Sequence, residues 1–368
     1  MKATNQNKVR VLVVCTVPTT KSGIPNVIFN LFEGMSNENI EFGYVSINEP
    51  PEEYKIRLKE LGINLYIIER NIKNPFSYIL KLCKVSKKYD ILHAHGNSAT
   101  LTLEMFSAKI AGIRKRIAHS HNTQCSMKII DCILRPFFYM LCNERMACGK
   151  EAGKWLFGKR PFKIINNGIN TSKFGFDIEN RFLICKELNL SNKKIIGNIA
   201  NFVEQKNHVF LIDIFAKIFE KDPSMHLLLI GDGPLITPIK LLVQNKGLEN
   251  NVSFLGSIEN PSKYYSAIDF IVMPSLFEGL PLTLIEAQAN GLRAIVSETI
   301  SRDVNITGNI SFMPLNLSAK EWAEKILSAV EYKYDRVKAS QEAINAIVLS
   351  GYEVGQNAKY LSSIYLNC

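Results

Sequence analysis

Residues 275–289 read SLFEGLPLTLIEAQA, and they follow an apolar run at residues 269–273. The apolar run predicts a buried strand, and Pro281 marks the first turn of a helix that continues through Ala289. A strand, a glycine-bearing loop and a helix are thus expected in that order. Such a helix presents unpaired N–H groups and the positive end of its dipole at its start, so the segment predicts a site for an anion.

Two carboxylates belong to this segment, Glu278 in the loop and Glu286 inside the helix. Their places differ too much for both to be ordinary surface charges on one helical face. One could reach a sugar beyond the phosphates while the other reaches a ribose. The competing interpretation is a polar loop followed by a solvated glutamate on an amphipathic helix, and the spacing alone does not decide between the two.

The chain has 368 residues, which exceeds the size at which one hydrophobic core keeps growing, so two domains are expected. Strand-like apolar runs alternate with helical patterns in both halves, which predicts an α/β fold. The composition turns polar between residues 170 and 192, where a domain boundary would fall. We therefore expect a first domain at residues 1–176, a hinge at residues 177–192 and a second domain at residues 193–350.

No uninterrupted apolar run reaches the roughly 18 residues that span a bilayer. The polar start and the short apolar run at residues 9–14 do not match a secretory leader. Eight scattered cysteines without a C-x-x-C pair predict no disulfide framework. These features together predict a cytoplasmic protein.

The net charge of +10 predicts an anionic partner without identifying it. Nucleic acid is disfavoured because no basic helix stands beside stacking aromatic residues, whereas a nucleoside diphosphate, a lipid diphosphate or an anionic membrane surface would fit. Residues 76–88 form a basic amphipathic pattern, and residues 130–141 are unusually apolar and aromatic. Each segment could contact a membrane surface, although packing against the protein is the more common use of such helices.

The first half begins with a strand-like run at residues 9–15, a loop that contains Gly23, and a helical pattern from about residue 26 to residue 35. This order copies the arrangement in which a phosphate approaches the start of a helix. One glycine is weaker than a complete G-x-G-x-x-G, so a plain strand-to-helix turn remains the alternative.

Four of the six histidines form two H-x-H pairs, His93 with His95 and His119 with His121, each at the end of a predicted strand. In an open α/β sheet the carboxyl ends of strands face the ligand crevice, which accounts for histidines there. Zinc is less well supported, because neither pair has a helical or knuckle spacing with cysteine or acidic companions. We expect no metal site.

The pair Glu278 and Glu286 resembles the Glu-x7-Glu signature of retaining glycosyltransferases of family 4, which have the two-domain GT-B fold. The similar segments cover nearly the whole chain and lie at residues 90–96, 119–122, 167–170, 197–208, 227–235, 252–256 and 269–297. The resemblance implies two Rossmann-like β/α/β domains facing each other across a central cleft. It also implies that the second domain binds the donor, the first binds the acceptor, and the last helix, at residues 351–368, crosses back to the first domain.

The resemblance implies roles for individual residues. Glu278 would bind hydroxyls of the sugar, and Glu286 those of the ribose. Lys206 would meet the diphosphate, on which charge develops as it leaves, and His121 would orient or polarise the sugar. The implied catalytic residues are thus His121, Glu278 and Lys206. Further donor contacts are implied at Gly23, Asn201, Gly231, Gly233, Gly279, Leu280, Pro281 and Leu282, and acceptor contacts at His95 and Asn97.

Two positions depart from the family pattern. Asn201 stands where the family usually has a phosphate-binding arginine, and Ser22 stands where a second glycine is often found. A neutral amide does not replace an arginine at a bidentate phosphate contact. Either another cation, with Lys159, Arg160 and Arg302 as candidates, takes its place or the activity is weak.

The function that the resemblance implies is retaining, metal-independent transfer of a hexosyl or N-acetylhexosaminyl group from a nucleotide sugar, with UDP as the expected nucleotide and no cofactor. The acceptor would be a hydroxyl of a glycan or lipid-linked glycan in surface or capsular polysaccharide synthesis, at the inner face of the membrane. Two alternatives stay open. One is a catalytically weak nucleotide-binding partner subunit of a membrane glycan-assembly complex, and the other is a nucleotide-sugar epimerase of the same architecture.

Overall fold

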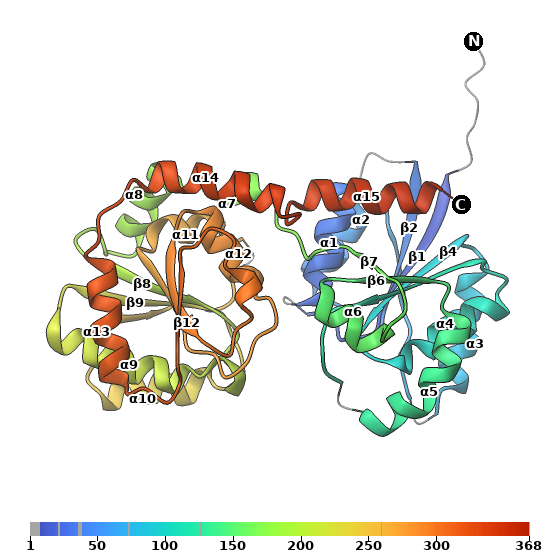
Figure 1. Ribbon diagram of the computed structural model, residues 1–368, viewed down its shortest axis with the longest axis horizontal. Coiled ribbons are helices and arrows are strands. Elements are labelled where there is room, and N and C mark those ends of the chain that lie inside the picture. Colours follow the sequence, from blue (N-terminus) through green and yellow to red (C-terminus); the bar gives the residue numbers. More distant parts are fainter. Residues whose placement is uncertain are drawn as a thin grey trace, which may run out of the picture. The chain divides into compact units, whose positions relative to one another are not determined.

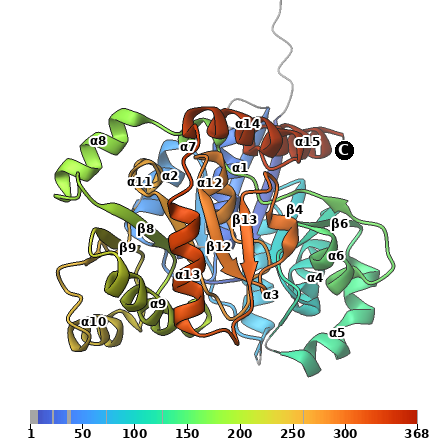
Figure 2. The same ribbon diagram turned by 60° about the vertical axis from the view of Figure 1, so that its left-hand side comes forward.

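The computed structural model describes residues 8–20, 23–35, 39–72, 74–125, 127–258 and 260–367, so Ser22 lies outside the described residues. The chain forms two compact units, unit 1 with residues 1–168 and 354–368 and unit 2 with residues 169–353 (Figure 1). Each unit has one parallel β-sheet with helices against it, and Figure 2 shows the helices of unit 2 on both faces of its sheet.

The sheet of unit 1 has seven strands in the order β3-β2-β1-β4-β5-β6-β7, all paired in parallel. β1 and β4 at its centre are almost wholly buried, which explains their continuous apolar runs. The strands are β1 Val9–Cys15, β2 Ile40–Ser46, β3 Asn64–Ile67, β4 Ile91–Gly96, β5 Lys115–Ser120, β6 Glu144–Ala147 and β7 Lys163–Ile164. The helices are α1 Ile24–Gly34, α2 Glu52–Glu60, α3 Phe76–Ser86, η1 Ala99–Leu101, α4 Thr102–Ile110, α5 Lys128–Leu141, α6 Lys150–Phe157 and α15 Val354–Leu366.

The helix at the C-terminal end of the chain, α15, packs against α1 of unit 1. A Cβ on Gly34 of α1 would lie 2.7 Å from the Cβ of Ala358, so this close contact between the two helices requires a glycine. Tyr365 of α15 reaches His93 of β4, with 2.5 Å between the phenol oxygen and Nδ1. The sequence analysis expected the last helix to return to the first domain, and α15 lies there.

The sheet of unit 2 has six strands in the order β10-β9-β8-β11-β12-β13, again all parallel. Its strands are β8 Lys194–Ile199, β9 Met225–Ile230, β10 Val252–Phe254, β11 Phe270–Met273, β12 Arg293–Ser297 and β13 Ile310–Met313. Its helices are α7 Thr171–Phe174, α8 Ile178–Glu187, η2 Glu204–Lys206, α9 His208–Lys221, α10 Ile236–Asn245, α11 Ser262–Ala267, α12 Leu282–Ala289, η3 Arg302–Val304, α13 Ala319–Val330 and α14 Arg336–Leu349.

The segment expected to be a hinge, residues 177–192, contains α8 and packs against α11 inside unit 2. The backbone N–H of Asp177 donates to Ser266 Oγ at 3.1 Å, and Arg181 forms a 2.7 Å ion pair with Asp269. The polar composition of the segment therefore reflects a helix with one solvent-facing side. The chain passes between the units at residues 168–169 and 353–354 instead.

Two further expectations concern the membrane and the cysteines. Within the described part of the chain, no helix is both long enough and apolar enough to cross a bilayer. The seven described cysteines are free thiols.

Candidate functional site

The segment at residues 275–289 forms the expected strand, loop and helix in unit 2. α12 begins at Leu282, and Pro281 is the residue that precedes the helix, with φ −70° and ψ 117°. The hydroxyls of Ser297 and Thr299 donate to the carbonyl of Ser275 at 2.5 and 2.9 Å, so the end of β12 holds the loop that follows β11. The loop thus has a fixed course before its chain turns into the helix.

Lys206 and Glu278 form an ion pair between Nζ and Oε1, and both side chains are largely buried. The two residues come from the loops after β8 and β11. Gln205 joins the same loops: its backbone carbonyl accepts the N–H of Leu276 at 2.8 Å, and its Nε2 donates to the carbonyl of Phe277 at 2.9 Å. The cation and the carboxylate that the sequence analysis named separately therefore meet just before the start of α12.

Glu286 lies in α12, where Tyr265 of α11 donates its hydroxyl to Oε2 at 2.5 Å. Burial raises the pKa of Glu286 to about 7, and the hydrogen bond from Tyr265 opposes part of this rise. The carboxyl is therefore close to half protonated at neutral pH, which makes it an acid–base group as well as a hydrogen-bond acceptor.

The glycines after β9 bring two loops of unit 2 into backbone contact. Gly231 and Gly233 have φ values of 144° and 155°. A Cβ on Gly231 would lie 2.0 Å from the carbonyl oxygen of Ala200, and one on Gly233 would lie 2.6 Å from that of Phe202. The close approach that requires these glycines is thus to the loop after β8, which carries Asn201 and Lys206.

Two other glycines named from the sequence stand in open surroundings. Gly23 precedes α1 with φ 67°, and no atom of the described residues lies within 4 Å of the position that its Cβ would take. The corresponding position of Gly279 is open in the same sense. Gly23 belongs to unit 1 and Gly279 to unit 2. Asn201 is exposed.

The four histidines of the H-x-H pairs form one group. His93 and His95 lie on β4, His119 lies on β5, and His121 follows the end of β5. β4 and β5 pair in parallel with His95 opposite His119, which places His93, His95, His119 and His121 on the same face of the sheet. Ring centroids lie 4.2 Å apart for His93 and His95 and 4.3 Å apart for His119 and His121. The rings are therefore stacked along each strand and lie side by side across the pair.

Hydrogen bonds define the protonation of this group. His121 Nδ1 lies 3.2 Å from Asn167 Oδ1, which can only accept, so Nδ1 carries the proton and Nε2 accepts from His95 Nδ1 at 2.8 Å. Burial lowers the pKa of His121 to about 4 and that of His93 to about 3. Burial also holds the pKa values of His95 and His119 well below the usual range. All four rings are neutral at physiological pH.

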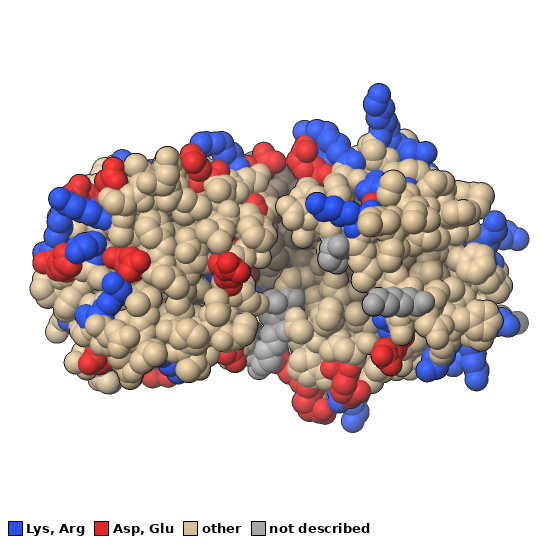
Figure 3. Space-filling view, turned by 90° about the horizontal axis from the view of Figure 1, so that it is seen from below, with Lys and Arg blue, Asp and Glu red and all other residues tan. Residues whose placement is uncertain are grey.

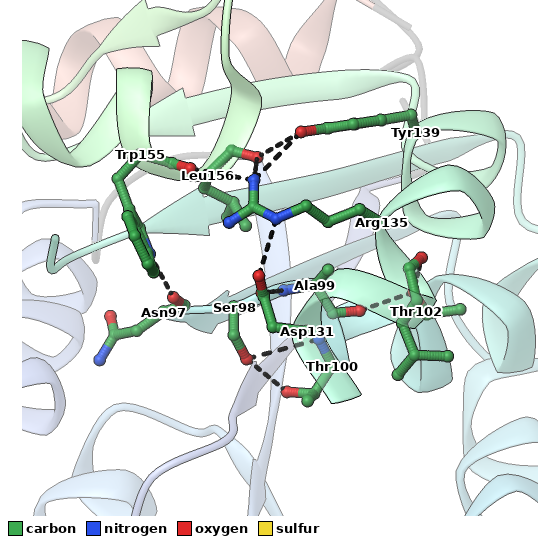
Figure 4. Close-up of polar contacts among 11 residues, drawn as sticks. Asn97, Ser98, Ala99, Thr100, Thr102, Asp131, Arg135, Tyr139, Trp155 and Leu156 are labelled. Atoms are coloured by element: carbon green, nitrogen blue, oxygen red, sulfur yellow. Dashed lines mark hydrogen bonds and ion pairs between the residues drawn. The ribbon is translucent and has the colours of Figure 1, made fainter. Parts of the chain in front are cut away.

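The two residues expected on the acceptor side differ in accessibility. His95 is 2% exposed and is hydrogen-bonded to His121. Asn97 follows β4; its backbone carbonyl accepts the indole N–H of Trp155 at 3.0 Å, as Figure 4 shows, and its buried Oδ1 has no hydrogen-bond partner among the described residues. Nitrogen atoms of His93, His95 and His119 all lie within 4.8 Å of one another, close enough to share a metal ion.

Residues 180–346 match the sequence pattern of a family described as glycosyl transferases group 1. An uncharacterized glycosyltransferase of Methanocaldococcus jannaschii, MJ1059, is 36% identical over 312 residues, which are 76% of this chain and 75% of that protein. The chain belongs to the group 1 glycosyltransferases. The resemblance found in the sequence is therefore confirmed at the level of the family.

Other relatives of this glycosyltransferase span more of its length. Putative glycosyltransferase EpsF of Bacillus subtilis (strain 168) is 29% identical over 98% of this chain and 97% of the relative. The Escherichia coli UDP-Gal:alpha-D-GlcNAc-diphosphoundecaprenol alpha-1,3-galactosyltransferase is 28% identical over 84% of this chain and 82% of the relative. The crystal structure of Anabaena Alr3699/HepE in complex with UDP superposes with a TM-score of 0.79 at 16% identity, over 98% of this chain and 100% of that one. This similarity confirms the expected GT-B fold with two Rossmann-like domains.

Sequence reasoning missed three polar side chains of this glycosyltransferase. Tyr265 is hydrogen-bonded to Glu286, and Asn167 is hydrogen-bonded to His121. Gln205 connects the loops after β8 and β11. Asn167 belongs to a segment that carried the family resemblance, and Gln205 directly precedes Lys206. The sequence could therefore have indicated both as site residues. Tyr265 had no such signal, because it lies outside the segments that carried the family resemblance.

Proposed function

We propose that this glycosyltransferase is a retaining enzyme that moves a sugar from a UDP-sugar to a hydroxyl of a glycan or lipid-linked glycan and forms an α-glycosidic bond. The ion pair between Lys206 and Glu278 before α12 carries the proposal, because it puts a phosphate-binding cation and a sugar-binding carboxylate at the start of one helix. The E. coli relative, with its UDP-Gal donor and diphosphoundecaprenol acceptor, and the UDP complex of the Anabaena protein support these substrates. A role in surface or capsular polysaccharide synthesis follows from the same acceptor class.

The ion pair has a mechanistic consequence. When the diphosphate binds, Lys206 would turn from Glu278 to the phosphates, and the freed carboxylate would take hydroxyls of the sugar. The backbone N–H groups of Gly279, Leu280 and Leu282 and the dipole of α12 add to the positive potential on the leaving diphosphate. Attack by the acceptor on the leaving-group face would then retain the configuration.

Glu286 and His121 take the remaining donor roles in this proposal. Glu286 accepts hydrogen bonds from the ribose hydroxyls, and His121 orients the sugar. Because His95 is buried and hydrogen-bonded to His121 Nε2, we assign His95 to positioning His121. Asn97 stays on the acceptor side, since its buried Oδ1 has no hydrogen-bond partner in the described part of the chain.

The missing arginine at Asn201 has one candidate substitute in unit 2. Ile300 pairs with Glu278 in an isolated bridge, and Arg302 follows two residues later, exposed and stacked on Phe312 with 4.8 Å between its Cζ and the ring centre. Lys159 and Arg160 belong to unit 1. We propose Arg302 as the second phosphate cation, so Arg302→Gln should weaken UDP binding by about tenfold.

The reaction is proposed to need no metal. Incubation with EDTA, followed by gel filtration into metal-free buffer, should leave the transfer rate unchanged. Loss of activity that zinc restores would contradict this statement and would direct attention to His93, His95 and His119.

Nucleotide binding is tested first by thermal stabilisation with UDP, GDP and ADP. Wild type should be stabilised by UDP in proportion to the logarithm of its concentration. Lys206→Gln should lose most of this shift. Lys217→Gln is the matched control, because Lys217 also pairs with a glutamate, Glu220, but on an exposed helix surface of unit 2, and it should behave like wild type.

Transfer is then tested with the nucleotide sugar of the nucleotide that binds. Glu278→Ala should abolish transfer if the protein is an enzyme. If Glu278→Ala changes only affinity while wild type shows no turnover, the chain is a nucleotide-binding partner subunit, the alternative that the exposed Asn201 supports. Conversion of the nucleotide sugar into its epimer in the absence of any acceptor would indicate an epimerase.

A further inference from the structure

Helix α5 of unit 1 turns Asp131 and Arg135 toward other elements of the unit. Asp131 is 4% exposed; its Oδ1 accepts the backbone N–H of Ala99 at 2.6 Å, and its Oδ2 accepts from Arg135 Nε at 2.7 Å. Arg135 also donates to the carbonyls of Trp155 and Leu156 at 3.0 and 3.2 Å, and Figure 4 shows this network. The polar groups of α5 are thus used to attach the helix to unit 1.

The opposite side of α5 is an exposed apolar stripe. Its members are Ile129, Ile133, Phe137 and Met140, with exposed fractions of 78%, 62%, 53% and 68%. Their spacing of four, four and three residues places them on one helical face. α5 also buries Phe138 and Leu141 in the core of unit 1, so the helix is apolar on two sides, and the exposed stripe is more than covering the core requires.

The two neighbouring helices carry exposed apolar pairs of their own. α4, which contacts both α3 and α5, exposes Phe106 and Ile110, and α3 exposes Phe76 and Leu80. Together with the stripe on α5 these residues define the α3–α5 surface. Eight large apolar side chains exposed on three adjoining helices exceed the scattered exposure of ordinary monomers, which indicates an interaction surface.

The exposed charges on the three helices themselves have one sign. The acidic residues of α3, α4 and α5 are Glu104 and Asp131, and both are buried in ion pairs, Glu104 with Arg70 and Asp131 with Arg135. The exposed charges of the three helices are lysines, namely Lys81, Lys84, Lys109 and Lys128. Figure 3, seen from below, shows a mostly uncharged face of unit 1 with lysine and arginine side chains at its outer edge and a group of acidic side chains at its lower edge.

We propose that the α3–α5 surface binds the face of an anionic lipid bilayer, with its apolar side chains at the level of the headgroups and its lysines beside the lipid phosphates. Apolar side chains on helices whose exposed charges are lysines match the chemistry of such a surface. A second copy of the chain is the poorer occupant, because it would bring the same lysines face to face. The inference rests on the proposed function in one respect: a lipid-linked acceptor would be presented at that bilayer.

The test is flotation of the full chain with vesicles of phosphatidylglycerol and phosphatidylcholine, compared with vesicles of phosphatidylcholine alone. Wild type should float with the anionic vesicles and release them in high salt. The double variant Ile133→Ser with Phe137→Ser should bind at least about tenfold more weakly. Lys81→Gln with Lys84→Gln should lose about tenfold as well, because each lysine adds its own attraction to the anionic surface.

A matched control comes from α8 of unit 2, which exposes Ile178 and Phe182 at the same four-residue spacing, each 64% exposed, but carries charges of both signs. Ile178→Ser with Phe182→Ser should leave vesicle binding within about twofold of wild type. Equal losses in the α5 and α8 variants would show that the binding is unspecific adhesion and would overturn the inference.

Two more results would overturn it. One is wild type that does not float with anionic vesicles. The other is wild type that sediments as a dimer and the α5 variant as a monomer, which would identify a second copy as the occupant. UDP stabilisation measured on the same preparations separates the two proposals: the α5 variant should keep the UDP shift, and absence of that shift in wild type would refute the donor site without affecting vesicle binding.

Discussion

Glu286 is the residue at which stability and binding should oppose each other. The folded-state pKa of about 7 lies above the ordinary glutamate value of 4.5, because burial disfavours the charged form. The folded protein therefore holds a proton that the unfolded chain releases, and its stability falls as pH rises from about 4.5 to about 7. The shift corresponds to up to about 3 kcal/mol.

We expect Glu286→Gln to be more stable than wild type above pH 7, by up to about 3 kcal/mol, and to differ little from it near pH 4.5. UDP binding should change in the other direction. Binding to wild type should tighten by about five- to tenfold from pH 6 to pH 8 as the carboxylate forms, since a charged acceptor makes the stronger hydrogen bond. Calorimetric titration and urea unfolding at both pH values check the two expectations.

In the Glu286→Gln variant, the only remaining pH dependence of UDP binding should come from the titration of UDP itself. This variant is therefore also the control for protonation of the nucleotide. A pH dependence of binding that is the same in both proteins would remove Glu286 from the ribose site. The sequence predicted a functional carboxylate at this position but not its pKa, because the burial and the partner Tyr265 come from an element 21 residues away.

At the scale of elements, the loops after β8 and β9 are held by backbone contact at Gly233. A Cβ there would lie 2.6 Å from the carbonyl oxygen of Phe202 and 2.8 Å from its nitrogen, and φ is 155°. Gly233→Ala should destabilise unit 2 by about 3 kcal/mol or more, because rigid backbone atoms must move. It should also weaken UDP binding, since the displaced loop carries Lys206.

Gly247→Ala separates the steric effect from the effect of φ. Gly247 has φ 67°, and none of the described atoms lies within 4 Å of the position that its Cβ would take. This variant should lose only about 1 kcal/mol, the cost of left-handed backbone for an alanine, and should keep its affinity for UDP. Similar thermal stabilities for the two alanine variants would contradict the packing argument.

The elements differ in how far the sequence could predict them. β1 and β11 were recognised as buried strands because parallel strands covered on both faces are continuously apolar, and the loop and helix after β11 followed from Gly279 and Pro281. The orientation of α5 could not be predicted. Its sequence is apolar on most sides, and the direction in which it faces depends on the bonds of Asp131 and Arg135 to other elements of unit 1.

For the whole molecule, composition predicted two α/β domains but not the point at which the chain passes between them. Residues 177–192 are polar because α8 exposes one side, whereas Gly168 and Ile169, where the units divide, belong to a segment that gave no such signal. A hinge is defined by the contacts that a segment lacks, and composition reports only its solvent exposure. Unit boundaries therefore had to come from the structure.

The distribution of the six histidines should make the stability of unit 1 more sensitive to acid than that of unit 2. Burial lowers the pKa of all six, including His208 and His226 of unit 2, each to about 4. A base whose folded-state pKa is depressed favours unfolding as pH falls below the unfolded value of about 6.5, by about 1.4 kcal/mol per pH unit for each histidine. Unit 1 contains four of the six, whereas unit 2 contains two, together with Glu286, whose raised pKa acts in the opposite direction over the same range.

We therefore expect unit 1 to lose at least about twice as much stability as unit 2 between pH 7 and pH 5.5. Each unit has its own tryptophan, Trp155 in unit 1 and Trp322 in unit 2, so fluorescence of the single-tryptophan variants Trp322→Phe and Trp155→Phe follows them separately during urea unfolding. His121→Gln should reduce the pH dependence of unit 1 by about one proton and leave that of unit 2 unchanged. Equal losses of unfolding free energy in both units would mean that the buried histidines of unit 1 are not what makes folding sensitive to acid. The depressed pKa values of the histidines on β4 and β5 would then be wrong.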